Sequence, residues 1–217
     1  MSPYYPVYLD VKDRLCVIIG GGQIAEGKIA SLLESGAQIK MISPEVTAEV
    51  QDMADAGILN LEKREYREGD LDGVFVAIAA TDDTLVSRRI AQEASEKNVL
   101  LNVADVTYLC TFIAPSVVKK GDVTVAISTS GLSPALARKL REDLEVDPVL
   151  DYAYLAPMLS EVRLELRKEG AKVSPDHWQQ CLTQDILTMY GNDKNAAKKS
   201  LKEALLQGSQ SGEISTS

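Results

Sequence analysis

The chain has 217 residues, enough for one large domain or two smaller ones, and its share of hydrophobic residues (45%) and charged residues (25%) is that of ordinary globular proteins. A net charge of −9 disfavours a nucleic-acid partner, which requires a basic face, but still permits a local basic patch that binds a small anion. No apolar run reaches the length of a membrane span, and the N-terminal residues lack the features of a signal peptide.

The N-terminal half alternates between apolar runs of strand length and amphipathic helical stretches. The predicted strands are 15–19, 39–42, 58–61, 74–80 and 99–103, separated by helices at about 24–35, at about 46–57 and after Thr81-Asp82-Asp83. The run 74–80 is apolar throughout, as expected for a strand covered on both faces. This alternation predicts an α/β, Rossmann-like parallel sheet with right-handed crossovers, and we assign residues 1–113 to it.

The pattern changes after Asp105. Short strands are predicted at 111–114 and 123–127, around a turn at Lys119-Lys120-Gly121-Asp122. Ser133 is placed to cap a helix that has Pro134 at its first position and ends at about Leu144. Further helices are predicted at about 148–169, 175–190 and 194–206. We therefore expect a small α+β region at 114–147, a helical C-terminal domain at 148–207 and a disordered polar tail at 208–217.

The most informative motif is the glycine triplet Gly20-Gly21-Gly22, between the first strand and the first helix. A turn without side chains lets a pyrophosphate approach the backbone closely, and the N–H groups and dipole of the new helix favour its negative charge. The pattern G-x-G-x-x-G/A is met with the strand and the helix that it requires, so a ligand-free tight turn is the weaker alternative. We expect NAD to bind here, with contacts from Gly20, Gly22, Gln23, Ile24 and Ala25.

The segment after the second strand distinguishes NAD from NADP in this fold. An acid there holds the ribose hydroxyls of NAD, whereas a nearby Arg holds a 2′-phosphate. Ser43, Pro44 and Glu45 occupy this place and no Arg follows closely, which favours NAD. The alternative is that Glu45 only caps the next helix, since acids are common in the first turns of helices.

Small and polar residues also follow the fourth and fifth strands. Open parallel sheets bind ligands beyond the carboxyl ends of their strands. Ala80, Thr81 and Asp82 would therefore approach the ribose and nicotinamide half of the cofactor, although Thr81 or Asp82 would serve equally as a helix cap. Asn102, at the end of the fifth strand, is assigned to the same cofactor site.

Asp105 is the candidate catalytic residue. It lies just past the fifth strand, where the nicotinamide should project. Loss of a hydride leaves a cation that must also lose a proton, and a carboxylate in that place can accept it. The alternative is an Asp that only forms a turn.

The remaining polar residues carry weaker signals. The chain has one histidine, His177, beside Trp178, and no spaced partners with which it could bind a metal, so a packing role is favoured and no metal site is predicted. Cys16, Cys110 and Cys181 form no CxxC pair and indicate thiols in a reducing, cytoplasmic compartment. A basic group around the helix after Pro134 is either solvated or contacts a substrate with many carboxylates: Lys119, Lys120, Arg138, Lys139 and Arg141.

Five motifs, in this order and at this spacing, resemble those of the precorrin-2 dehydrogenase family of sirohaem biosynthesis. They are Gly20-Gly21-Gly22, Ala79-Ala80-Thr81-Asp82-Asp83, Asn102-Val103-Ala104-Asp105, Phe112-Ile113-Ala114-Pro115-Ser116 and Ser128-Thr129-Ser130-Gly131-Leu132-Ser133-Pro134-Ala135-Leu136-Ala137-Arg138. The resemblance covers residues 5 to about 145, and the helical remainder is similar in character only.

The resemblance implies an NAD-dependent oxidation of precorrin-2 to sirohydrochlorin by a homodimer that associates through residues 114–147. It implies that Asp105 is the important acid of the active-site cleft and that the loop Ser128, Thr129, Ser130 and Gly131 lines this cleft; Arg138 is assigned to the substrate with it. Two alternatives stay open. One is a bifunctional dehydrogenase and sirohydrochlorin ferrochelatase, and the other is a non-catalytic, nucleotide-sensing regulatory module of the same fold.

Overall fold

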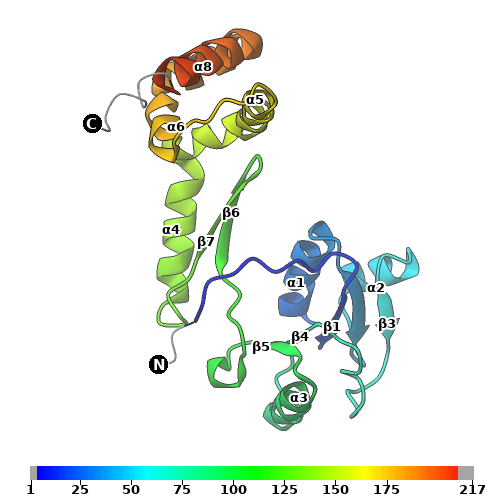
Figure 1. Cartoon of the computed structure of the whole chain (residues 1–217). Helices are drawn as coiled ribbons and strands as arrows, with labels where there is room; N and C mark the ends of the chain where they lie inside the picture. The colour runs from blue at the N-terminus through cyan, green and yellow to red at the C-terminus, as the bar shows by residue number, and fades with distance from the viewer. Residues whose placement is uncertain (1–3, 210–217) are drawn as a thin grey trace. The chain divides into compact units, whose positions relative to one another are not determined.

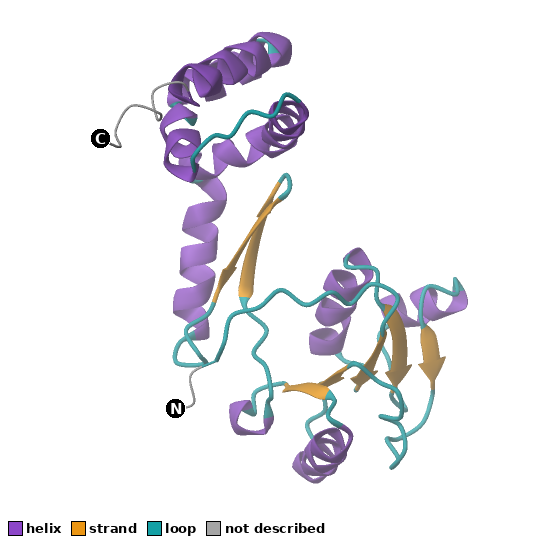
Figure 2. Ribbon diagram, viewed as in Figure 1, coloured by secondary structure: helices purple, strands orange, loops and turns teal. Residues whose placement is uncertain are grey.

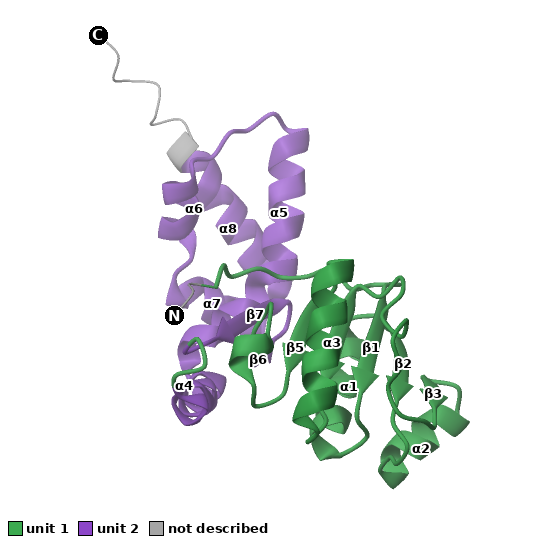
Figure 3. Ribbon diagram, turned by 90° about the horizontal axis from the view of Figure 1, so that it is seen from below, with its two compact units in different colours: residues 1–114, 130–132 green, residues 115–129, 133–217 purple. Residues whose placement is uncertain are grey.

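A computed structural model describes residues 4–209 of the chain (Figure 1, Figure 2). The chain divides into two compact units (Figure 3). The first contains residues 1–114 and 130–132, and the second contains residues 115–129 and 133–217. No helix among residues 4–209 is long and apolar enough to cross a membrane.

The first unit is built on a five-stranded parallel sheet in the order β3-β2-β1-β4-β5. Its elements are β1 (Leu15–Ile19), α1 (Gln23–Glu34), β2 (Gln38–Ile42), α2 (Ala48–Asp55), β3 (Asn60–Glu62), β4 (Val76–Ala79), α3 (Thr84–Lys97), β5 (Leu100–Val103) and the short 3-10 helix η1 (Thr107–Leu109). The chain runs outward from β1 to β3, then returns to place β4 on the other side of β1. The carboxyl ends of β1 and β4 therefore flank the point where ligands bind in such sheets.

Alternation along β1 explains why both faces of the sheet are covered. Val17 and Ile19 belong to one buried cluster, which includes Ile90 of α3. Cys16 and Ile18 belong to the other, which includes Ala25 and Ile29 of α1 and Val50 of α2. Successive strand residues point to opposite faces, so a strand with helices on both sides must be apolar throughout. All of β4 is buried, which confirms the interpretation of the apolar run around it.

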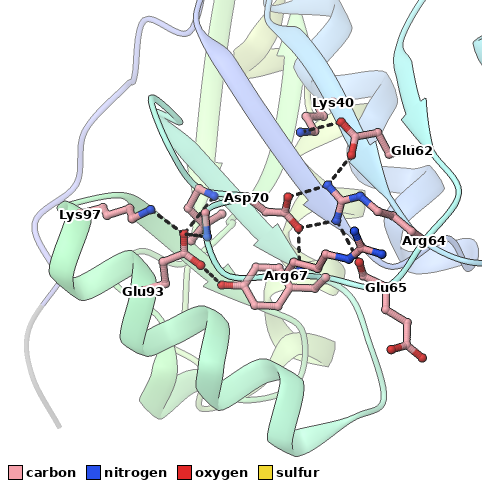
Figure 4. Close-up of polar contacts among 11 residues, drawn as sticks. Lys40, Glu62, Arg64, Glu65, Arg67, Asp70, Glu93 and Lys97 are labelled. Carbon is pink, nitrogen blue, oxygen red and sulfur yellow. Dashed lines mark hydrogen bonds and ion pairs between the residues drawn. The ribbon is translucent and has the colours of Figure 1, made fainter.

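A polar network holds the segment between β3 and β4 against α3 (Figure 4). Glu93 of α3 is 4% exposed, and its carboxylate accepts hydrogen bonds from the backbone N–H groups of Gly69 (3.0 Å) and Leu71 (3.2 Å). The carboxylate also accepts a hydrogen bond from the hydroxyl of Tyr66, and one of its oxygens lies 2.8 Å from Lys97 Nζ. Burial by itself raises the pKa of Glu93, but the hydrogen bonds outweigh it, led by those from Lys97 and Tyr66, and hold the pKa below its ordinary value.

We expect Glu93→Gln to lower the free energy of unfolding by about 1–3 kcal/mol, because a buried carboxylate with four donors loses its charge. Since the folded state lowers the pKa of Glu93, the unfolded state binds more protons, and this contribution disappears as the pH falls below about 4. Urea unfolding at several pH values measures both effects. Glu96→Gln, on the exposed side of the same helix, is the matched control and should change stability little; an equal loss in both variants would contradict the prediction.

The second unit contains a hairpin and a helical bundle. The antiparallel strands β6 (Ser116–Lys120) and β7 (Val123–Ile127) are packed against α4 (Pro134–Val146). The 3-10 helix η2 (Pro148–Leu155) leads into α5 (Ala156–Lys168), α6 (Pro175–Cys181), α7 (Gln184–Asn192) and α8 (Lys194–Ser209). A buried cluster that includes Leu155, Val162 and Leu201 forms the core of the bundle. The predicted cap is confirmed, because the Ser133 hydroxyl accepts the N–H of Leu136 at 3.2 Å.

The strand predicted at 111–114 is wrong. This segment instead folds back on the end of β5, where the N–H of Thr111 donates to the carbonyl of Leu101 at 2.8 Å. Pro115 has no N–H to donate, and the strand ladder begins after it, at Ser116. The turn is also shorter than predicted: Lys119 and Lys120 belong to β6, and Gly121 and Asp122 alone connect the strands, with Gly121 at a φ of +56°.

The helices predicted at about 148–169 and 175–190 are each divided in two. Pro157 cannot donate the hydrogen bond that would carry a helix through from Pro148, so a 3-10 segment precedes α5. The run predicted at 175–190 ends at Cys181, and the Thr183 hydroxyl caps a new helix by accepting the N–H of Ile186 at 3.4 Å. The tail prediction is wrong at residues 208–209, which end α8; residues 210–217 lie outside the described part of the chain.

Candidate functional site

The glycine turn, Gly20-Gly21-Gly22, lies at the carboxyl end of β1 and is closed on two sides by neighbouring backbone. Gly20 has a φ of +108°, and a Cβ there would collide with the carbonyl of Ala80, just past β4. A Cβ on Gly21 would collide with the carbonyl of Glu45, after β2. Only glycine fits these two positions, because the loops after β1, β2 and β4 pack directly on one another.

Gly22 is different, and its surroundings fit a bound cofactor. Its φ of −83° is open to any residue, and a Cβ there would have no atom of the protein within 4 Å. Gly22 precedes α1, so the free N–H groups of that helix begin beside this open space. The fold therefore leaves room where a pyrophosphate would contact a helix N-terminus.

The other residues predicted around the turn divide between solvent and core. Gln23 is exposed and Ile24 is 51% exposed, whereas Ala25 is completely buried against the sheet. The small size of Ala25 lets α1 pack closely on the strands, as the third place of the motif requires. Gln23 and Ile24 are accessible to a ligand, and Ala25 acts through packing.

The segment after β2 is fixed by backbone contacts. Ser43 is 5% exposed and donates its hydroxyl to the carbonyl of Glu45 at 2.5 Å, while Pro44 and Glu45 are exposed. The suggestion that Glu45 serves the cap of the next helix is wrong, because Thr47 is the N-cap of α2 and accepts the N–H of Val50. The Glu45 side chain thus remains open to solvent beside the glycine turn.

The segment after β4 presents Ala80, Thr81 and Asp82 at the same edge of the sheet. Ala80 and Thr81 are half-buried and Asp82 is exposed. Neither Thr81 nor Asp82 caps α3, because Asp83 does so by accepting the N–H groups of Leu85 (2.8 Å) and Val86 (3.1 Å). Leu85, in the first turn of this helix, is 73% exposed.

Asn102 of β5 is tied to the segment that follows it. Its side-chain amide donates to the carbonyl of Phe112 at 3.1 Å and lies 3.7 Å from Cys110 Sγ. Burial raises the pKa of the Cys110 thiol, which also receives the N–H of Val103. This arrangement holds the chain beyond β5 in place.

Asp105 lies in the left-handed region with a φ of +59° and is exposed. Asp is one of the few residue types that adopt this conformation at low cost, so the position also suits a turn. Its carboxylate accepts no hydrogen bond and forms no ion pair among residues 4–209, and it is thus available to a ligand.

The structure brings part of the predicted substrate loop to the segment just after Asp105. Ser130 and Gly131 belong to the first unit, both in the left-handed region with φ values of +54° and +82°. A Cβ on Gly131 would lie 3.3 Å from Cγ2 of Thr107, which is two positions after Asp105. Ser128, Thr129 and Arg138 lie in the second unit. There the Thr129 hydroxyl donates to the carbonyl of Ser133 at 3.1 Å, and Arg138 is exposed on α4.

Two further residues position the site and were missed from the sequence. The Thr47 hydroxyl donates to a carboxylate oxygen of Glu26 at 2.8 Å, which joins α2 to the first turn of α1. The N–H of Thr47 also donates to the carbonyl of Gly21 at 3.1 Å. The position of Thr47 just before a helical stretch was the available signal; its pairing with Glu26 is a tertiary contact.

His177 has a partner within the bundle, since its Nε2 lies 3.0 Å from the carbonyl oxygen of Ala204. Across residues 4–209, no group of three or more His, Cys, Asp and Glu side chains is arranged as a metal site.

Comparisons with known proteins agree with this arrangement. Residues 7–116 match a family model described as putative NAD(P)-binding, and residues 120–146 match the model of the central region of sirohaem biosynthesis proteins. A solved structure of a precorrin-2 dehydrogenase is similar at a TM-score of 0.67 and 28% identity, covering 96% of this chain and all of that one.

Curated relatives are siroheme synthases. The one from Photorhabdus laumondii is 33% identical over 97% of this chain, and the one from Methylobacillus flagellatus is 37% identical over 73% of it. These matches cover 46% and 34% of the relatives, so the chain spans about half their length or less.

Proposed function

This chain belongs to the NAD(P)-binding precorrin-2 dehydrogenase family of sirohaem biosynthesis, and on that premise we propose that it oxidises precorrin-2 to sirohydrochlorin with NAD. The observation that carries the proposal is the glycine turn, which is closed by protein at Gly20 and Gly21 and open at Gly22. Mixing the protein with NAD and precorrin-2 tests it: the absorbance of the reduced nicotinamide should appear together with the spectrum of sirohydrochlorin. A protein that binds NAD but produces neither signal would instead support a regulatory module.

The site residues divide into those that bind the cofactor and those that act on the substrate. The N–H groups at the start of α1 bind the pyrophosphate, and the exposed Glu45 contacts the adenosine ribose. Ala80, Thr81 and Asp82 line the path of the second ribose, and Asn102 holds the segment beyond β5. When bound, the nicotinamide accepts a hydride from the substrate. Asp105 accepts the proton that leaves with it, while Ser128 to Gly131 and Arg138 contact the carboxylates of the tetrapyrrole.

We expect kcat/KM to be at least about tenfold higher with NAD than with NADP, since an exposed carboxylate beside the ribose repels a 2′-phosphate. The nearest arginine after β3, Arg64, is held by Asp70 and Glu62, with its Nη1 2.7 Å from Asp70 Oδ2. Steady-state rates with both nucleotides measure the ratio, and Glu45→Gln should reduce it. Equal use of NAD and NADP by the wild type would contradict the assignment of Glu45.

We also propose that the chain forms a homodimer through residues 114–147, in agreement with the apolar side chains that this region exposes. On and just before α4, Leu132, Leu136 and Leu140 follow one another at four-residue spacing and are 71%, 50% and 42% exposed. Val117 of β6 is 39% exposed. A surface of this kind is typical of a subunit interface.

Light scattering should therefore give a mass of twice the 23.6 kDa of one chain. Leu136→Asp with Leu140→Asp should shift it to that of one chain, because a dimer would bury two carboxylates without partners. Leu164→Asp, at a comparably exposed leucine of α5, should leave the mass unchanged. A wild-type protein with the mass of a single chain at micromolar concentration would refute the dimer.

We also propose that the protein acts in the reducing cytoplasm, which the three free cysteines suit.

A further inference from the structure

The helical part of the second unit contains a pocket that the proposed reaction does not use. Its volume is about 780 Å³, and it is formed by α5, the segment 169–174 and α6. The two helices are labelled in Figure 1. Pockets for small molecules have volumes of about 300–1,000 Å³. All of its lining residues belong to the second unit.

The pocket has a basic wall. Arg163 and Arg167 of α5 and Lys172 of the following segment line it, and no Asp or Glu does. Arg163 and Arg167 are four positions apart, so they project from the same face of the helix. Arginine presents a planar fork of donors that matches a carboxylate with two parallel hydrogen bonds.

These cations are not neutralised by the rest of the bundle. The acidic residues of α5 lie on another face and pair with α8, where Lys198 Nζ is 2.6 Å from Glu161 and Lys202 Nζ is 3.0 Å from Glu165. Within residues 4–209, neither Arg163, Arg167 nor Lys172 forms an ion pair. In a chain with a net charge of −9, a pocket with three unpaired cations provides a local attraction for anions.

The remaining wall is apolar and partly flat. Trp178 of α6 lines it together with Leu159 and Val173, and all three also pack against the buried core of the bundle. That packing holds the indole in place, and an indole face favours contact with a flat ring. The combination suits a ligand that has a large apolar ring and several carboxylates at its edge.

We propose that this pocket binds a tetrapyrrole polycarboxylate, with its ring against Trp178 and its carboxylates paired with Arg163, Arg167 and Lys172. The choice of a tetrapyrrole rests on the proposed function, which makes this the class of molecule that the protein meets. The basic wall alone would accept any small anion; the apolar wall selects one with a ring.

Trp178 is the only tryptophan of the chain, so its fluorescence reports on this pocket. The protein is titrated with uroporphyrin, a stable porphyrin with carboxylates around its edge, and emission is corrected for absorption by the porphyrin. We expect saturable quenching. Arg163→Gln with Arg167→Gln should raise the Kd at least about tenfold, since two charge-assisted contacts are lost. Lys168→Gln, on the same helix but outside the pocket, should change the Kd less than about twofold, as expected of an exposed, screened charge.

Apart from an absence of quenching, two results would overturn the inference. One is quenching that is equally strong in the double arginine variant, which would place the ligand elsewhere. The other is equal quenching by a porphyrin with cationic arms, which would mean that charge plays no part. The dehydrogenase assay is separate: turnover of precorrin-2 without quenching rejects the pocket and leaves the proposed function, whereas quenching without turnover rejects the proposed function and supports the pocket.

Discussion

Replacing Gly22 by aspartate is expected to reduce NAD affinity at least about a hundredfold while leaving the fold intact. An added carboxylate at the pyrophosphate site introduces both a steric clash with the ligand and repulsion between like charges. The protein itself should tolerate the change, since Gly22 has an unstrained φ and a Cβ there meets no protein atom within 4 Å. Any loss of binding can therefore be assigned to the clash and the charge repulsion at the pyrophosphate site, and not to misfolding.

Calorimetric titration with NAD measures the effect, and circular dichroism checks the fold. Gly27→Asp is the matched control, because it adds the same charge to the same helix, also at a glycine whose Cβ would meet no other atom within 4 Å. Gly27 lies about 7–8 Å further along the helix at a rise of about 1.5 Å per residue, and solvent ions screen an exposed charge there, so this control should lose much less affinity than Gly22→Asp. Unchanged NAD affinity in a folded Gly22→Asp protein would show that the cofactor does not bind at the glycine turn.

Asp105→Asn is expected to lower kcat about 10²–10⁴-fold, the usual contribution of general acid–base catalysis, with little change in NAD affinity. Asparagine keeps the size of the side chain and tolerates the left-handed backbone that Asp105 adopts, so only the ability to accept a proton is lost. Asp13→Asn is the matched control, because Asp13 is also exposed and has nearly the same φ, +58° compared with +59°.

Steady-state rates at saturating NAD, together with direct NAD titration, separate the possible outcomes. A loss smaller than about tenfold would mean that the proton leaves to water and that Asp105 only orients the substrate. A fall in NAD affinity as large as the fall in rate would make Asp105 a cofactor contact. Either result would reject the role as a base.

The amino-acid sequence by itself determined the first unit closely. Four of the five strands of the parallel sheet are built on short apolar runs bounded by Gly, Pro or polar residues, so their identity is encoded locally, and the order of motifs indicated the family. The exception is β3, which has one apolar residue, Leu61, between Asn60 and Glu62. The glycine turn could also be recognised, because glycine is required wherever backbone segments meet without room for a side chain. The caps of the later helices were equally local: Ser133 was predicted correctly since its hydroxyl bonds only to a residue three positions away.

Tertiary structure decided what depends on contacts between distant residues. The segment 111–114 has the composition of a strand, yet its hydrogen bonds go to Leu101, and no local pattern records that partner. Thr47 and Glu26 are joined across 21 positions, and the loop residues Ser130 and Gly131 reach the first unit from a sequence position beyond the hairpin. The basic pocket likewise depends on tertiary contacts, because the lysines of α8 pair with the glutamates of α5, which leaves Arg163 and Arg167 without ion-pair partners among residues 4–209. Hydrophobic spacing along a chain specifies which face of an element is buried, but which other element covers that face is decided only when the whole chain packs.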